Sequence, residues 1–193
     1  MRPDTPRYRR TSWLDPRIEV RSSRIEGRGL FAREPIHAGE VVAVMGGIPI
    51  TTAQLAEIIA TGKAYSCAAI GEDLNLLQDA DDALGYGNHS CNPNLWMRDA
   101  ITIEARHAVQ PNDEVTTDYA LMTVDPAWRM RCQCGSRECR GVIRGDDWRR
   151  ESLQGRYRGH FVPFIDERIQ RLRDNFRDSG VSLLISGQKQ RGE

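Results

Sequence analysis

The sequence predicts a mostly β domain of short strands, followed by a small cysteine-rich segment and a C-terminal helical extension. Residues 18–50 alternate short apolar runs with glycine-containing turns, which is typical of several short strands. Residues 132–141, CQCGSRECRG, have too little apolar content to fold alone. Apolar residues recur at helical spacing over 52–60 and 164–177. With 193 residues, 39% of them hydrophobic, the chain can form one compact core.

The first half of the chain begins with a segment that favours no regular structure. Residues 1–16 contain three prolines and much charge, so we expect an extended or disordered lead-in. The core is expected to begin near Ile18, and residues 41–45 form the clearest strand. Residues 52–60 predict a helix because Leu55, Ile58 and Ile59 share one face, with Thr51 or Thr52 as its cap.

The second half continues the pattern of short strands. Residues 64–71 and 72–80 predict a strand pair that turns at Gly71, and the loop NHSCNPN follows at 88–94. Residues 101–105 and 114–119 again predict strands. Four positions with helical spacing predict the amphipathic helix 164–177, namely Phe164 or Ile165, Ile169, Leu172 and Phe176. Residues 186–193 are expected to be a frayed tail.

Charge and targeting signals narrow the class of protein. The 27 basic and 27 acidic residues give a net charge of +0, so general polyanion binding and direct nucleic-acid binding are not expected. The charged N-terminus has no apolar signal region, and no window approaches a membrane span. An intracellular, cytoplasmic protein is expected. Only Lys63 and Lys189 are lysines among the 27 basic residues, and this bias toward arginine indicates a prokaryotic host.

The cysteines indicate a metal site. Cys132, Cys134 and Cys139 form C-x-C-x4-C, and three thiolates leave one position of a closed tetrahedral zinc site to be filled. Cys91 in the NHSCNPN loop is the candidate fourth ligand. The alternatives are two disulfides or unrelated core thiols, which a reducing compartment disfavours, or His89 in place of one cysteine. Cys67 lies in the apolar run AYSCAAI and is expected to be an ordinary buried thiol.

Four segments together resemble a known family. GRGLFA at 27–32, NHSCNPN at 88–94, DEVTTDYA at 113–120 and CQCGSRECRG at 132–141 occur in the order of a SET-domain protein lysine methyltransferase with a post-SET zinc module. The resemblance implies the β-clip SET fold, in which small β-sheets surround a pseudoknot. It implies a flexible segment at 1–16, a SET domain at 17–122, a post-SET zinc module at 123–145 and a helical extension with a frayed tail at 146–193.

The resemblance also implies roles for individual residues. Arg28, Gly29 and Leu30 match the turn that contacts the methionine part of S-adenosylmethionine. Asn88 and His89 match the pair whose main chain and side chains hold the adenosine. Tyr119 matches the catalytic tyrosine beside the transferring methyl group. The alternatives for these residues are a plain strand turn, a structural Asx turn and half-buried strand packing.

The substrate channel is less clearly marked. Tyr65 and Tyr86 are candidates for the channel that admits the substrate lysine, and core packing is the alternative for both. Thr117 replaces the Phe or Tyr that the family usually has two residues before the tyrosine. Trp128 and Trp148, which flank the cysteines, are candidates to close the channel or cover the cofactor, or to pack on the zinc loops.

Two functions are therefore carried forward. The first is S-adenosylmethionine-dependent methylation of a lysine on a protein substrate, with one structural Zn²⁺. The second is a catalytically inactive SET-fold module that binds a protein or nucleic acid, which Thr117 and the unusual run LGYG before the NHS loop favour. The intact Tyr119 and the complete cysteine set favour the enzyme.

Overall fold

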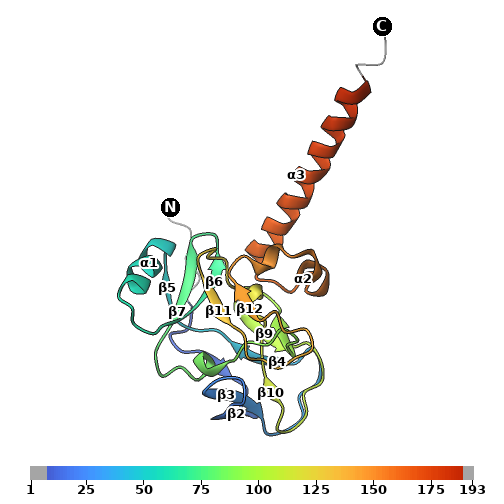
Figure 1. The fold of residues 1–193 in the computed structure, drawn as a ribbon. Coiled ribbons are helices and arrows are strands. Elements are labelled where there is room, and N and C mark those ends of the chain that lie inside the picture. Colours follow the sequence, from blue (N-terminus) through green and yellow to red (C-terminus); the bar gives the residue numbers. More distant parts are fainter. Residues whose placement is uncertain (1–7, 189–193) are drawn as a thin grey trace.

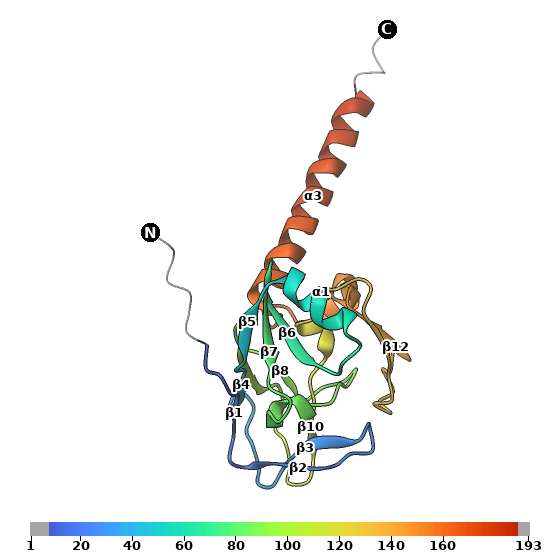
Figure 2. The same cartoon turned by 90° about the vertical axis from the view of Figure 1, so that its left-hand side faces the viewer.

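The computed structural model describes residues 8–188 of the chain, and Figures 1 and 2 show them as a body of small sheets from which one long helix projects. Each sheet is antiparallel, and each is built from short strands. The predicted mostly β fold with a C-terminal helix is confirmed. Strands of two to six residues bury few side chains each, so the core has to form between sheets rather than on one of them.

The sheets divide the chain into four groups of strands. The largest sheet has the order β1 (Trp13–Leu14), β4 (Val41–Val44), β9 (Thr102–Ala105) and β8 (Leu95–Met97). The second has the order β10 (Glu114–Val115), β3 (Arg28–Ala32) and β2 (Ile18–Ser22). The third has the order β5 (Ile48–Ile50), β7 (Leu74–Gln78) and β6 (Ser66–Gly71), and the fourth pairs β11 (Arg129–Arg131) with β12 (Val142–Arg144).

Six helical segments complete the fold. They are α1 (Thr52–Ala60), η1 (Ala83–Tyr86), η2 (Tyr119–Leu121), η3 (Asp147–Arg149), α2 (Glu151–Arg156) and α3 (Pro163–Gln188). The predicted helix 52–60 is confirmed, and Thr51 caps it by a capping box with Gln54. The strand pair predicted around Gly71 is confirmed as β6 and β7.

Three expectations about local structure need correction. Residues 114–119 do not form one strand: β10 ends at Val115, Thr117 makes a single bridge to His89, and η2 begins at Tyr119. The lead-in 1–16 is not disordered throughout, because the extended segment β1 pairs with β4; residues 1–7 lie outside the described residues. The helix predicted to end at 177 continues to Gln188, which includes the first three residues of the expected frayed tail; residues 189–193 lie outside the described part.

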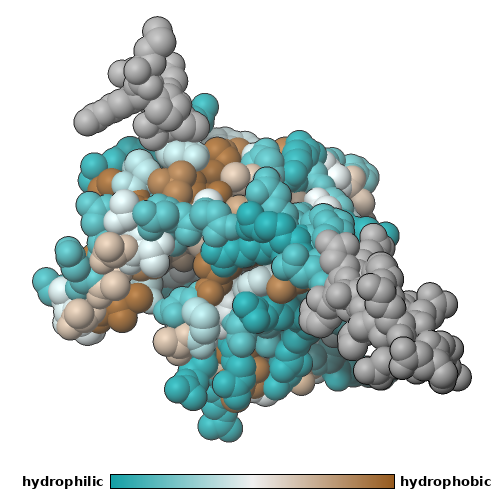
Figure 3. All heavy atoms as spheres, turned by 90° about the horizontal axis from the view of Figure 1, so that it is seen from above, coloured by the Kyte–Doolittle hydropathy of each residue, from teal (hydrophilic) through white to brown (hydrophobic). Residues whose placement is uncertain are grey.

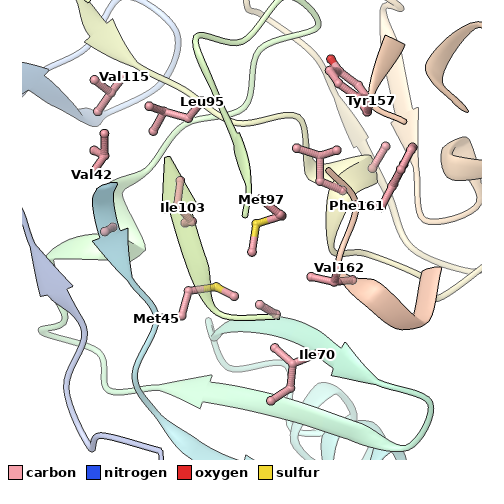
Figure 4. Close-up of a cluster of buried hydrophobic side chains, with 14 of the residues drawn as sticks. Val42, Met45, Ile70, Leu95, Met97, Ile103, Val115, Tyr157, Phe161 and Val162 are labelled. Atoms are coloured by element: carbon pink, nitrogen blue, oxygen red, sulfur yellow. The ribbon is translucent and has the colours of Figure 1, made fainter. Parts of the chain in front are cut away.

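The core joins the sheets to the C-terminal extension. Met97 of the largest sheet lies between Ile103 and the pair Phe161 and Val162, which precedes α3, and Val42 belongs to the same core farther from that pair (Figure 4). Tyr157 and Ile165 are both 0% exposed. The extension is therefore part of the main core, and only the later part of α3 projects from the body in both views (Figures 1 and 2).

Within the described residues, no helix is both long and apolar enough to cross a membrane.

Candidate functional site

At the centre of the site, the loop at 88–94 crosses the segment at 114–119 and is hydrogen-bonded to it. The amide of Thr117 donates to the carbonyl of Asn88 (3.2 Å), and the amide of Ser90 donates to the carbonyl of Thr117 (3.0 Å). Asn94, at the end of the loop, also joins the two segments: its side chain accepts from the amide of Thr116 (2.9 Å) and donates to the carbonyl of Glu114 (2.9 Å). These bonds place segments about 30 residues apart side by side.

Tyr119 lies where this crossing ends. The carboxylate of Asp118 accepts from the amide of Ala120 (3.0 Å), which caps η2 and starts that short helix at Tyr119. The Tyr119 hydroxyl donates to the carbonyl of Gly87 (2.8 Å), and its amide donates to Nδ1 of His89 (3.2 Å). Burial, with a smaller contribution from the charge of Glu26, raises the pKa of Tyr119 to about 12. The hydroxyl therefore keeps its proton at neutral pH.

A cavity of about 770 Å³ opens beside Tyr119. Its walls include Tyr119, Gly87, Thr117, Tyr65 and Trp128, together with many aliphatic side chains. The ring of Trp128 lies 6.2 Å from that of Tyr119. Figure 3 shows hollowed surface with hydrophobic residues around it on the face turned to the viewer. The volume and the apolar lining of the cavity suit a linear side chain.

Tyr86 does not line this cavity. The guanidinium of Arg28 lies 4.5 Å from the centre of its ring, a cation–π contact on the side of β3. Its role in a substrate channel therefore remains a prediction that the geometry does not favour. Tyr65 and Thr117, the other two predicted channel residues, both contribute to the wall. Trp148 is 4% exposed and belongs to the core, so it does not cover the site.

Residues at the start of β3 form the opposite side of the crossing. The side-chain amide of Asn88 donates to the carbonyl of Arg28 (3.0 Å) and to the carboxylate of Glu114 (2.7 Å). The same carboxylate accepts from the Ser23 hydroxyl (2.9 Å). A Cβ at Gly29 would lie 2.1 Å from a Glu114 oxygen, so a side chain here would displace the Glu114 carboxylate from Asn88. Leu30 is buried and reaches the cavity.

The His89 side chain is turned away from this surface. It is 2% exposed, and its Nε2 lies 3.3 Å from Sγ of Cys91. Burial outweighs the attraction of Asp118 and lowers the pKa of His89 to about 4, so the ring is neutral at pH 7. In the described part of the chain no hydrogen bond engages the main-chain N–H or C=O of His89. A ligand at this position would therefore bind the main chain rather than the ring.

The four predicted cysteine ligands come together. The Sγ atoms of Cys91, Cys132, Cys134 and Cys139 all lie within 4.8 Å of one another. A tetrahedral zinc with bonds of about 2.3 Å places its sulfurs about 3.8 Å apart, and Cys91 and Cys132 have this separation of 3.8 Å. All five cysteines are free, so the disulfide alternative is wrong, and His89 is not a member of the cluster.

The thiols differ in how readily they ionise. Burial raises the pKa of Cys91 to about 11 and raises that of Cys132 further. Burial also disfavours the thiolate of Cys134, but hydrogen bonds from the amides of Cys91 and Ser136 and from the Ser136 hydroxyl lower its pKa to about 6. Neighbouring buried thiolates repel one another, so a cation is needed to hold all four sulfurs in the charged form. The donor set fits Zn²⁺.

A buried ion-pair network that sequence analysis did not predict contacts the cysteine loop and the segment of Tyr119. Both Nη atoms of Arg140 donate to Asp118 (2.6 and 2.8 Å), and its Nε lies 3.0 Å from Asp147. The Tyr157 hydroxyl also donates to Asp118 (3.2 Å), and Arg156 donates to the carbonyl of Cys91 (2.8 Å). The C-terminal extension thus holds both the tyrosine segment and the cysteine loop. The position of Arg140 directly after Cys139 was the only local signal.

Comparisons with known proteins agree with this geometry. The family model described as SET domain matches residues 27–120. Human "Histone-lysine N-methyltransferase 2B" is 33% identical over 138 residues, which cover 65% of this chain and 5% of that protein. "Histone-lysine N-methyltransferase, H3 lysine-4 specific" of Cryptococcus neoformans is 35% identical over 140 residues, covering 63% and 9%. The chain thus spans less than a tenth of these relatives.

Solved structures show the same fold. The methyltransferase domain of human Histone-lysine N-methyltransferase SETMAR aligns with a TM-score of 0.55 and 21% identity, covering 66% of this chain and 58% of that one. KRYPTONITE, solved in complex with mCHG DNA and SAH, aligns with a TM-score of 0.52 and 26% identity, covering 67% and 29%. The predicted SET fold is confirmed.

Proposed function

Residues 27–120 of this chain are a SET domain, and we propose that the protein transfers a methyl group from S-adenosylmethionine to the side-chain amine of a lysine in a protein substrate. The observation that carries the proposal is the position of Tyr119, which lines a largely apolar cavity and whose hydroxyl is held by the carbonyl of Gly87 in the loop 87–89. The relatives are histone-lysine methyltransferases by name, so core histones are the first substrates to test. A non-catalytic binding module would not require a buried hydroxyl held at this point.

The residues around β3 fit the cofactor. S-adenosylmethionine carries a carboxylate, an adenine ring and an electrophilic methyl group on a sulfonium, and that methyl group is the chemistry it supplies. Arg28 is exposed at the start of β3 and offers a cation for the carboxylate. The main chain of His89, which has no partner in the described residues, offers a donor and an acceptor for the adenine. Asn88 supports this loop through Glu114.

The cavity prepares the lysine. A free lysine with a pKa of about 10.4 is neutral at pH 7 about once in 2,500 molecules, so presenting the amine costs about 4.6 kcal/mol. The aromatic and aliphatic walls disfavour the ammonium form and lower that cost. No general base is needed for this step, because water can take the proton before the amine enters.

Tyr119 then orients the reacting groups. Its hydroxyl oxygen can accept a weak C–H hydrogen bond from the polarised methyl group, worth about 0.5–1 kcal/mol. Alignment of the amine, methyl carbon and sulfur supplies far more, about 7–11 kcal/mol in favourable cases. The bond to Gly87 keeps the oxygen in one place while this alignment forms.

The four cysteines support the same site in the proposed enzyme. A structural zinc held by Cys91 and the three cysteines of the module would close the wall of the cavity at Trp128, because β11 begins directly after that residue. Zinc supplies cross-linking at this position and no redox chemistry.

The test is methyl transfer onto purified core histones with tritiated S-adenosylmethionine, followed by recovery of labelled methyl-lysine after hydrolysis. We expect label with the zinc-loaded protein and strong loss of turnover in Tyr119→Phe, with cofactor affinity largely retained. Absence of labelled lysine with folded, cofactor-binding protein would favour the non-catalytic module for this substrate. Equal loss of turnover and cofactor binding in Tyr119→Phe would contradict the role of the hydroxyl.

A further inference from the structure

The imidazole of His89 lies between the cysteine cluster and Tyr119. Its Nε2 is 3.3 Å from Sγ of Cys91, and its Nδ1 is 3.2 Å from the amide nitrogen of Tyr119. The carboxylate of Asp118 is the next polar group, 3.6 Å from Nδ1. The ring is 2% exposed, so water does not compete for either nitrogen. Both ends of the ring are therefore used inside the protein.

The hydrogen-bond donors fix which nitrogen carries the proton. The amide of Tyr119 can only donate, so Nδ1 has to accept and is unprotonated. The single proton of the neutral ring then lies on Nε2 and points at the sulfur of Cys91. The amide of Arg140 donates to the same sulfur (3.3 Å). Two N–H groups, one from the His89 ring and one from the Arg140 main chain, therefore lie against the sulfur of a proposed metal ligand.

Tyr119 is held at two points by residues of one loop. His89 accepts from its amide, and the carbonyl of Gly87 accepts from its hydroxyl (2.8 Å). A rotation of the His89 ring would release the first of these bonds and shift the start of η2. The orientation of the ring depends in turn on the sulfur of Cys91, which a bound metal would hold in place.

We propose that the His89 side chain is a positioning residue that couples the metal centre to Tyr119, through an Nε2–H···Sγ bond to Cys91 and an Nδ1···H–N bond from Tyr119. Groups that hydrogen-bond to metal ligands orient those ligands, and their loss typically costs 10–100-fold in metal affinity or activity. The coupling follows from the geometry alone, while its effect on turnover rests on the proposed methyl transfer. It differs from cofactor binding, which would use the main chain of His89.

The first experiment uses the unaltered protein. Nitrogen NMR of the uniformly ¹⁵N-labelled, zinc-loaded protein reports which ring nitrogen of His89 carries the proton. We expect the Nε2–H form, and exchange of zinc for cadmium is expected to shift both the His89 ring and the Tyr119 amide signals. The amide of Val42 in β4 serves as the control that stays unchanged. A proton on Nδ1, or a metal exchange that leaves both signals unmoved, would overturn the proposal.

The second experiment separates the two bonds with a pair of substitutions. A glutamine amide reaches the position of Nε2, and an asparagine amide reaches that of Nδ1. His89→Gln is expected to keep metal affinity, measured by chelator competition, and to lower kcat by 10–100-fold. His89→Asn is expected to lower metal affinity by 10–100-fold and, at saturating zinc, to lower kcat less than His89→Gln does. The exposed His107→Asn is the matched control and is expected to change neither.

Calorimetric titration of S-adenosylmethionine confirms that each variant is folded and retains its cofactor site. Equal losses of metal affinity and kcat in both variants, or no loss in either, would contradict the coupling. If the protein transfers no methyl group at all, the NMR result and the metal affinities still decide whether the coupling exists.

Discussion

Replacing Arg140 by methionine tests whether the buried ion-pair network holds the catalytic segments together. The Arg140 side chain is 8% exposed and lies between Asp118, which is 0% exposed, and Asp147, which is 2% exposed. Without the guanidinium, the donors that Asp118 keeps among the described residues are the Tyr157 hydroxyl and the Ala120 amide. Breaking a buried pair by removing one partner costs about 3–5 kcal/mol, because a charge is left uncompensated.

The structure places the expected loss within that range. Two carboxylates lose their common partner, but Asp147 retains Arg150, whose side chain is 51% exposed and gives weaker compensation. We therefore expect Arg140→Met to lower the free energy of unfolding by about 4 kcal/mol. Equilibrium urea unfolding at a fixed free zinc concentration measures this change, because metal binding also shifts the apparent stability.

The matched control is Glu138→Gln. Glu138 pairs with Arg156 (2.6 Å) but its side chain is 48% exposed, so we expect a loss below about 1 kcal/mol. A loss in Arg140→Met no greater than in Glu138→Gln would refute the reasoning. Zinc content is measured in both proteins, since Arg140 follows a metal ligand directly.

Three further predictions follow from the site and the core. Chelation of zinc is expected to abolish binding of S-adenosylmethionine and to change the fluorescence of Trp128. Atomic absorption is expected to find one zinc per chain in Cys67→Ser but less in Cys139→Ser. Equal zinc content in the two variants would contradict the four-cysteine site. Because the pKa of Tyr119 is raised to about 12, its hydroxyl stays protonated over the range in which the substrate lysine loses its proton, so kcat/KM is expected to rise with pH. A pH–rate profile in which kcat/KM already decreases with rising pH before pH 10 is reached would count against this. Ile165→Ala, at a position 0% exposed, is expected to cost about 2–5 kcal/mol in thermal or urea unfolding, whereas an effect under 1 kcal/mol would mean that α3 is not part of the core.

Local signals in the sequence account for most of the fold. The helix at 52–60 was found because its cap and its apolar face lie within ten residues. The strand predicted at 114–119 failed because Thr117 pairs with His89 in another segment, and no local pattern records such a crossing. Two-residue β1 has too few residues to show an alternation. The length of α3 beyond 177 was missed because its apolar spacing becomes irregular there.

Sequence analysis predicts those parts of the site in which residue type and spacing alone indicate the chemistry. The cysteine cluster follows from C-x-C-x4-C and the one cysteine in the Asn-rich loop, and the structure brings these four together. The partners of Arg140 could not be predicted, because a charged residue in sequence does not indicate which distant carboxylate it will meet. The inward orientation of His89 likewise depends on the main-chain crossing and not on its neighbours in sequence.

Calorimetric titration of S-adenosylmethionine into the zinc-loaded protein tests the central claim most directly, because it requires no knowledge of the substrate. The account predicts one-to-one binding that is lost in Cys132→Ser and weakened in Asn88→Ala, while the surface variant His107→Asn binds as the unaltered protein does. No binding by folded protein that contains one zinc per chain would contradict a methyltransferase site and would favour a SET-fold module that only binds its partner.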